Sequence, residues 1–372
     1  MKHNYFFDTL KFNHKYPLLA SIGKQVLFWI IAFNLLFFIV HHHTLSILSF
    51  LGHSFEARLL PLILFVVFIG LFFGVALGLF DYVMRRIYHK NHPLGVNILV
   101  GSVLYFIVVM GLVYLTRSTA QFLSDGLFLD QALKGLFSDA NWKHFNYILM
   151  GYTFFMTLVI SFIGQMNQKF GPGYLLPILF GRFRYPREEE RIFMFLDLAS
   201  STKLAEQLEH IKYSALIQDC FIDINKVVRK YNADIYQYVG DEVVVSWPAE
   251  DLQNYACTEF FFAVQERLGR RKQYYLQTYG VLPSFKAGLH MGIVTMVEVG
   301  DVKRDIAYHG DTLNVAARLE GLCKETQQPI LVSAVVKERL KLDEKYTTIS
   351  LGHRKLSGRE IPVEIFGLAP RN

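Results

Sequence analysis

The sequence is poor in cysteine. Only three cysteines occur in 372 residues, namely Cys220, Cys257 and Cys323. All lie in the second half, form no CxxC pair and cannot all be paired with one another. This pattern excludes a disulfide-stapled mini-protein and argues against a zinc site. We therefore expect reduced, buried thiols in a cytosolic domain.

Charged residues are also scarce. They make up 19% of the chain and hydrophobic residues 52%, whereas an ordinary soluble domain has roughly 25% charged residues. The mean hydropathy is +0.27. This balance excludes a disordered or collagen-like chain and favours a membrane protein. The length favours two or three domains, at about 150 residues each.

Four long apolar stretches account for the hydrophobic excess, and all lie within residues 1–163. Each is close to the roughly 20 residues that a helix needs to cross a bilayer. No small-residue cleavage site follows the first stretch, so it is not expected to be a signal peptide. We predict a transmembrane anchor over 1–163 with four helices, at about 18–40, 59–80, 95–115 and 147–163.

Lysine and arginine indicate which side of the membrane each end faces. They gather in the N-terminal segment, in the loop after the second stretch and after the fourth stretch, as Lys2, Lys11, Lys15, Lys24, Arg85, Arg86, Lys90, Lys169, Arg182, Arg184 and Arg187. The positive-inside rule then places both termini in the cytoplasm, on a multi-pass protein of the inner (plasma) membrane. These flanks largely explain the net charge of +6, so we expect a lipid bilayer and no nucleic acid as partner.

Other features of this half have modest implications. Gly70, Gly74 and Gly78 lie four residues apart, a spacing that predicts close helix packing within or between subunits. The run His41–His43 favours a solvated interfacial cluster over a metal or proton-sensing site, and Asp81 favours an interfacial charge. The apolar stretches hold no charge at mid-membrane, which argues against a transporter or channel.

Residues 164–190 are rich in Gly and Pro, end in a charge run, and are interpreted as a connector. Residues 191–372 mix short apolar runs with helical spacing, which favours an α+β sheet domain with helices on one face over a doubly wound fold. We expect strands at 192–198 and on both sides of Gly240, and a strand, turn and strand over 285–299. A long helix is expected over 251–278.

Two carboxylates occupy strand ends in this half. Asp197 ends the apolar run FMFLD, and Asp241 lies at the tip of the predicted hairpin. If the strand lies beside the hairpin, the carboxylates converge, and paired carboxylates with substrate phosphates suit Mg²⁺ or Mn²⁺. Each residue by itself favours a plainer role, as a cap or a turn residue.

A second group of residues is suited to anions. Asn314 and Arg318 are four residues apart, so they share one face of a predicted helix over 311–325. The alternative for Arg318 is an ion pair with a glutamate on a solvated face. Lys355 and Arg359 flank a glycine turn, which suits either phosphate binding or a charged hairpin.

Residues 191–367 resemble the catalytic domain of class III nucleotidyl cyclases. The matching segments, in order, are RIFMFLDLASST, IYQYVGDEVVVSWP, KAGLHMGIV and RDIAYHGDTLNVAARLEGLC. The apolar half resembles the multi-span anchors of many bacterial cyclases only by its hydropathy. The resemblance implies a ferredoxin-like-related α/β sandwich for residues 191–372.

The resemblance also implies roles for individual residues. Asp197 and Asp241, helped by the Leu198 carbonyl, are expected to bind two Mg²⁺ or Mn²⁺ ions per site. Arg318 is expected to stabilise the α-phosphate and Asn314 to orient the ribose. Lys355 or Arg359 is expected to contact the β- and γ-phosphates. Because one chain carries both sets, a head-to-tail homodimer with two equivalent sites is implied.

The base-recognising positions depart from the family patterns. Adenylate cyclases usually have Lys where this chain has Gln237, and Asp or Thr where it has Ala307. Gln237 can still hydrogen-bond a base edge, but the Ala307 side chain cannot. ATP is the first expectation, because bacterial class III cyclases are mostly adenylate cyclases. GTP and pyrimidine triphosphates remain alternatives.

Two further interpretations compete with a nucleotidyl cyclase. The segment VGDEV over 239–243 is similar to the GGDEF signature of diguanylate cyclases, but its first glycine and the phenylalanine are missing. A catalytically inactive, nucleotide-binding membrane receptor is the other alternative. It is disfavoured because every residue expected to bind metal or stabilise the transition state is present.

Overall fold

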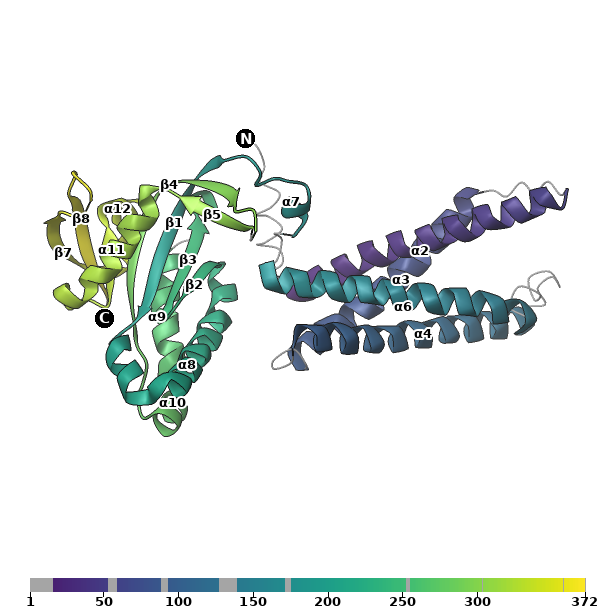
Figure 1. Cartoon of the computed structure of the whole chain (residues 1–372), viewed down its shortest axis with the longest axis horizontal. Helices are drawn as coiled ribbons and strands as arrows, with labels where there is room; N and C mark the ends of the chain where they lie inside the picture. Colours follow the sequence, from purple (N-terminus) through teal and green to yellow (C-terminus); the bar gives the residue numbers. More distant parts are fainter. Residues whose placement is uncertain are drawn as a thin grey trace. The chain divides into compact units, whose positions relative to one another are not determined.

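The computed structural model describes residues 16–52, 59–87, 93–126, 139–170, 175–251, 255–302, 304–356 and 358–371. The chain divides into two compact units, Met1–Leu179 and Phe180–Asn372 (Figure 1). Of the positive residues that predict the orientation, Lys2, Lys11, Lys15 and Lys90 lie outside the described residues.

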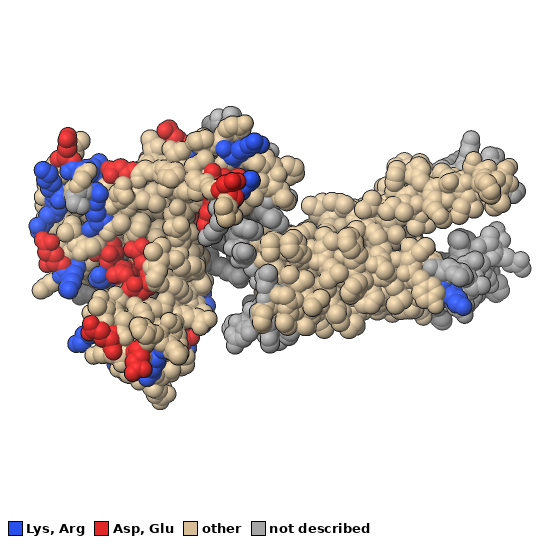
Figure 2. Space-filling view, in the orientation of Figure 1, with Lys and Arg blue, Asp and Glu red and all other residues tan. Residues whose placement is uncertain are grey.

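The first unit contains four long apolar helices, α2 (Pro17–Phe50), α3 (Leu59–Ile87), α4 (Leu94–Gly126) and α6 (Asp139–Phe170). All four are long and apolar enough to cross a membrane, which confirms the predicted number of hydrophobic helices. On the face shown in Figure 2, almost no charged side chains lie on these helices, and charge gathers on the second unit. The short helix α7 (Leu175–Leu179) ends this unit.

The glycines of α3 allow α2 to approach its backbone closely. A Cβ added at Gly74 would lie 2.3 Å from the Cα of Val26, a distance that real atoms do not adopt. Gly70 and Gly78 face the backbone of α2 in the same way, against Ile30 and Ile22. The predicted close packing is therefore present, and it joins two helices of one chain.

Asp81 is buried in the helical unit instead of lying as a solvated charge. Its side chain accepts hydrogen bonds from Ser21 Oγ at 2.7 Å and Tyr105 Oη at 2.5 Å, so it joins α3 to α2 and α4. Helix α2 continues beyond its predicted end at residue 40 to Phe50 and includes His41–His43, of which His42 and His43 are exposed.

The second unit is built on one eight-stranded sheet. Its strand order is β2-β3-β1-β4-β6-β8-β7, and β5 pairs with β4. The strands are β1 (Arg187–Leu198), β2 (Asp234–Val239), β3 (Glu242–Pro248), β4 (Phe285–Val299), β5 (Asp305–His309), β6 (Ile330–Ser333), β7 (Tyr346–Arg354) and β8 (Val363–Pro370). The helices are α8 (Ser201–Val228), α9 (Ala256–Arg270), α10 (Lys272–Tyr279), α11 (Asp311–Thr326) and α12 (Ala334–Leu340).

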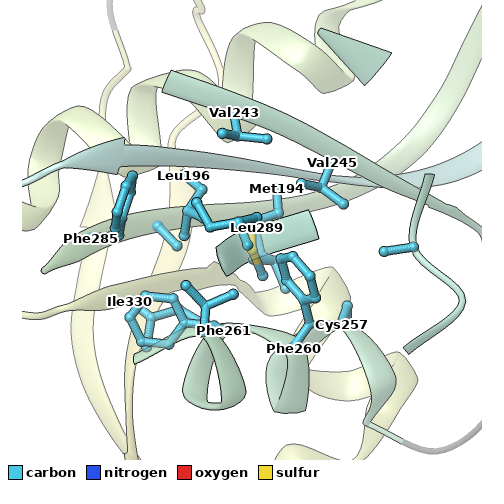
Figure 3. Packing of buried hydrophobic residues seen from close by; sticks show 14 of the residues in the cluster. Met194, Leu196, Val243, Val245, Cys257, Phe260, Phe261, Phe285, Leu289 and Ile330 are labelled. Carbon is cyan, nitrogen blue, oxygen red and sulfur yellow. The ribbon is translucent and has the colours of Figure 1, made fainter. Parts of the chain in front are cut away.

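Helices cover both faces of this sheet, so the expectation of one covered face is wrong. On one face, residues of α8 and α9 pack with alternate residues of β1, β3 and β4, among them Met194, Val245 and Phe260 (Figure 3). On the other face, α11 packs through Val315 and Leu319 against β6 and β8. Strand alternation explains both layers, because successive side chains point to opposite faces.

Three predicted elements differ in detail. The expected strand, turn and strand over 285–299 is one fifteen-residue strand, β4. Its glycines serve the close approach of α11, since a Cβ at Gly288 would lie 2.3 Å from Ala316 O. The expected long helix over 251–278 is divided at Arg271 into α9 and α10. Strand β1 begins at Arg187, so the acidic run over 188–190 belongs to the sheet and not to the connector.

Candidate active site

The metal-binding candidate Asp197 lies near the end of the central strand β1. There it is opposite Glu242 of β3 and Lys286 of β4 in the two antiparallel ladders. After Leu198 the chain turns through Ser200, whose φ is +60°, and Ala199 N donates to Ser284 O at 2.9 Å. The buried apolar run of β1 therefore delivers one carboxylate to the strand end, where the chain leaves the sheet.

Asp241 reaches the same place from the turn between β2 and β3. Gly240 has a φ of +62°, a left-handed conformation that favours glycine and that reverses the chain tightly. The carboxylate of Asp241 is close enough to Asp197 for its charge to raise the pKa of Asp197. The structure thus brings the two carboxylates together, as the sequence predicts.

The electrostatic environment of this site is strongly negative. Burial raises the pKa of Asp197 to about 6, with Glu320 and Asp241 adding to the rise and Lys286 opposing it. Burial likewise raises the pKa of Glu242 to about 7, and the charges of Asp197, Glu320 and Asp241 contribute. A cation bound here would relieve this repulsion and favour the ionised carboxylates.

The residues present fit a hard divalent cation. Asp241 Oδ2 is buried and has no hydrogen-bond partner among the described residues, so a polar atom is available at the site. Within the described part of the chain, no three His, Cys, Asp or Glu side chains are arranged as a metal site. Two carboxylates, the Leu198 carbonyl and substrate oxygens match the way Mg²⁺ is usually held.

Three further charged residues belong to this site and were missed in the sequence. Lys286 Nζ lies 3.3 Å from Asp197 Oδ2 and 2.9 Å from Glu320 Oε1. Glu242 could have been suspected, because it adjoins Asp241. Lys286 and Glu320 carry no local signal, since the pairing of β4 with β1 brings Lys286 to Asp197 and the packing of α11 on β4 brings Glu320 there.

Asn314 and Arg318 lie on α11, which Gly288 and Gly292 of β4 allow to pack directly on the sheet. Asn314 is exposed. Arg318 Nη1 is buried with no hydrogen-bond partner among the described residues, and no ion pair of Arg318 is present there. A guanidinium with an unused donor at this position is suited to an anion.

Arg318 and Glu320 point in different directions from α11. A helix turns about 100° per residue, so side chains two residues apart project to nearly opposite sides. Glu320 contacts Lys286 beside Asp197, whereas the Arg318 guanidinium lies against the loop at Gly358, whose added Cβ would be 3.4 Å from Nη2. Within one chain, the carboxylates beside Glu320 and the guanidinium beside Gly358 therefore lie on different sides of α11.

The loop after β7 contributes the other predicted phosphate contacts. Arg359 Nε lies 3.3 Å from Asp311 Oδ2, which fixes Arg359 to the start of α11. Lys355 is exposed and forms no ion pair with a described residue. Arg359 is thus held on the same side of the domain as Arg318, and Lys355 is not held in place.

The base-recognising candidates lie on neighbouring segments. Gln237 is exposed on β2, and half-buried Ala307 lies on β5 opposite Val297. The residues next to them are in contact, because Tyr308 N donates to Tyr236 Oη at 3.2 Å. This contact joins the β4–β5 hairpin to β2 next to both candidate positions.

Comparisons with known proteins agree with this architecture. The family described as the adenylate and guanylate cyclase catalytic domain matches residues 184–368. The chain is 30% identical to adenylate cyclase 2 of Rhizobium meliloti (strain 1021) over 291 residues, which is 77% of each protein. It is 31% identical to adenylate cyclase 1 of the same organism over 185 residues, which is 48% of this chain and 27% of that protein.

A solved structure shows the same fold. A bacterial light-regulated adenylyl cyclase superposes with a TM-score of 0.51 at 22% identity, over 60% of this chain and 66% of the other. The fold and site define a class III nucleotidyl cyclase domain preceded by hydrophobic helices. The chain belongs to the adenylate and guanylate cyclase family.

Proposed function

We propose that this protein is a membrane-anchored adenylate cyclase that converts ATP to 3′,5′-cyclic AMP and pyrophosphate as a homodimer. One observation carries the proposal. Arg318 and the carboxylate pair lie on opposite sides of α11 in one chain, which supports a site that combines the carboxylates of one copy with the guanidinium of another. Head-to-tail pairing gives two equivalent sites.

In the proposed reaction, the ribose 3′-oxygen attacks the α-phosphorus of ATP. A new P–O bond closes the ring, the bond between the α-phosphorus and the bridging oxygen breaks, and pyrophosphate leaves. The 3′-hydroxyl proton passes to solvent or to a substrate oxygen, because no residue of this chain is assigned as the base. Divalent metal, when bound, lowers the pKa of the 3′-hydroxyl and neutralises the triphosphate.

The protein residues bind and orient. Asp197, Asp241 and the Leu198 carbonyl are proposed to hold two Mg²⁺ or Mn²⁺ ions against the triphosphate. From the other copy, Arg318 donates to the α-phosphate, where charge develops in the transition state, and Asn314 orients the ribose. Arg359 is preferred to Lys355 for the outer phosphates, because Asp311 and Gly358 hold its loop beside α11.

The preference for ATP is supported by the relatives. The two Rhizobium meliloti proteins are adenylate cyclases, and the longer alignment of 291 residues extends beyond the 193 residues of the second unit. Gln237 is the one side chain of the two base-recognising positions that can hydrogen-bond the adenine edge. GTP is the alternative substrate, since the family includes guanylate cyclases.

The apolar helices are proposed to span the inner (plasma) membrane four times, with both termini in the cytoplasm. The four candidate spans and the lysines and arginines at their ends support this arrangement. The catalytic unit would then lie on the side of the membrane where nucleoside triphosphates are made.

The decisive experiment is complementation between two inactive copies. Asp197→Ala and Arg318→Ala, carrying different tags, are co-expressed at full length and copurified in detergent. Each variant by itself should be inactive. Dimers that carry both tags should regain about half of wild-type activity, because each heterodimer has one intact site of two.

The matched control pairs Asp197→Ala with Asp241→Ala, which damage the same half-site and should not recover. If one chain builds the whole site, the Asp197→Ala and Arg318→Ala variants copurify but regain no activity, which contradicts the proposal.

Products from ATP, GTP, CTP and UTP with Mn²⁺ are identified by mass spectrometry with the wild-type protein. Cyclic GMP or a cyclic pyrimidine nucleotide as main product would replace ATP as the substrate. A folded dimer without any cyclic product would support the inactive-receptor alternative.

A further inference from the structure

Lys286 is the one described cation in direct contact with the carboxylate half-site. Its ammonium lies 2.9 Å from Glu320 Oε1 and 3.3 Å from Asp197 Oδ2. Glu242 is paired with Asp197 across β1 and β3, and Asp241 precedes it in the turn. One ammonium is therefore shared between two carboxylates, one on β1 and one on α11.

The fold holds Glu320 firmly in this position. A Cβ at Gly288 would lie 2.2 Å from the backbone nitrogen of Glu320, so α11 is in tight contact with β4 two residues from Lys286. Glu320 is nearly buried, with 11% of its side chain exposed, and Lys286 and Asp197 are each 21% exposed. Charges that are largely removed from water in this way interact more strongly than surface pairs.

The Lys286 ammonium lies within ion-pair distance of both carboxylates. An ammonium beside Asp197 competes directly with any metal ion for the same oxygen atoms, because both require the ionised carboxylate. The position of this ammonium between its two acceptors therefore affects how readily a metal binds.

We propose that Lys286 is an internal counter-cation of the metal half-site and that Glu320 is a positioning residue, which draws the ammonium from Asp197 when a divalent cation binds. This inference rests on the metal site of the proposed function. Without metal, Lys286 bridges Asp197 and Glu320 and limits their repulsion. With metal, Lys286 pairs with Glu320 alone, and Asp197 is released as a ligand.

The test measures binding of Mn²⁺ alone to the full-length protein in detergent, from the loss of the free-ion EPR signal. Glu320→Gln should raise the dissociation constant about tenfold, because Lys286 is left with Asp197 as its only close partner. Lys286→Met should lower the dissociation constant several-fold. Lys286→Arg, which keeps the charge, should restore binding close to wild type.

Loss of a negative charge weakens cation binding by itself, so two controls separate that effect. Glu242→Gln removes a carboxylate beside Asp197 that has no contact with Lys286, and its effect should be smaller than that of Glu320→Gln. In the Lys286→Met background, Glu320→Gln should have no larger effect than Glu242→Gln. Such a double-mutant cycle isolates coupling through the lysine.

Two outcomes would overturn the inference. One is a full effect of Glu320→Gln in the Lys286→Met background, which means that Glu320 acts on the metal directly. The other is weaker Mn²⁺ binding by Lys286→Met, measured on protein with wild-type melting temperature. Asp197→Ala gives the reference: if it binds Mn²⁺ like the wild type, the proposed metal site itself is wrong, which is a distinct failure.

Discussion

Arg359 and Lys355 flank the same glycine, but the fold holds only one of them. Arg359 is paired with Asp311 and adjoins Gly358, which lies against Arg318, whereas Lys355 is exposed. We expect Arg359→Ala to lower kcat/KM for ATP by about 10- to 100-fold, the value of a lost charged hydrogen bond. Lys355→Ala is the matched control and should change it less than about threefold, as for a solvated charge. Steady-state kinetics of both variants checks this, and the reverse ranking would reassign the phosphate contact.

His290 gives the catalytic unit a sensitivity to acid. It is buried on β4, and its Nδ1 lies 2.8 Å from Ser333 Oγ. Burial lowers its pKa to about 4, with Arg359 adding to the effect and Asp311 opposing it. Because the folded state resists protonation while the unfolded histidine titrates near its usual value of about 6.5, stability is lost as the pH falls through this window.

We therefore expect the catalytic unit to lose about 2 kcal/mol between pH 7 and pH 5 through this one group. His290→Gln, which cannot titrate, should show a smaller loss over the same range. Melting temperatures of the full-length proteins in detergent at several pH values make the comparison. Parallel pH profiles for the two proteins would mean that the acid sensitivity lies elsewhere.

At the scale of secondary-structure elements, the contact between β4 and α11 is the critical one. A methyl group at Gly288 would collide with the α11 backbone at Glu320 N and Ala316 O, and backbone cannot move aside as a side chain can. Gly288→Ala should therefore displace α11, which carries Asn314 and Arg318. We expect a loss of stability of about 2 kcal/mol or more and near-complete loss of activity.

Gly321 provides the control on the same helix. A Cβ added there meets nothing within 4 Å. Gly321→Ala should stabilise α11 by about 0.5–1 kcal/mol, since alanine is the better helix former, and should leave activity unchanged. Thermal melting and cyclase assays on both variants test the pair. Equal melting temperatures and activities of the two variants would show that the α11 backbone does not pack against Gly288.

At the scale of the whole molecule, the segment that follows the membrane helices is attached to the catalytic sheet. Phe183 is buried, and its carbonyl accepts a hydrogen bond from Glu298 N at 2.8 Å. Glu298 lies in the β4–β5 hairpin that also carries Ala307. The second unit therefore begins with a segment that contacts the hairpin bearing Ala307, one of the two proposed base-recognising positions.

The proposed membrane anchor should matter most for assembly. Two copies held in one bilayer meet at a high effective concentration, whereas soluble units must find each other by diffusion. We expect residues 180–372 by themselves to be at least about tenfold less active per subunit than the full chain at nanomolar concentration. The difference should disappear as the concentration of the soluble unit is raised. Specific activity measured over a dilution series checks this, and activity independent of concentration would contradict it.

Several features follow from local sequence patterns. Long apolar runs specify four hydrophobic helices, because hydrophobicity over some twenty residues needs no tertiary context. The spacing of Asn314 and Arg318 places them on one helix, and the strand and turn around Asp197 and Asp241 suffice to predict paired carboxylates. Motif order along the chain identifies the family.

Other features depend on contacts between residues far apart in the sequence, which local patterns do not encode. The sequence around Gly288 and Gly292 predicts a turn, but both glycines lie within one long strand. Their missing side chains allow the backbone of α11 to pack closely against β4. Lys286 and Glu320 gain their place beside Asp197 only when β4, α11 and β1 are packed together. The sequence by itself determined the family and the proposed metal and phosphate residues, because these lie in local motifs. The tertiary structure decided which side chains lie beside them, because that depends on how strands and helices are layered.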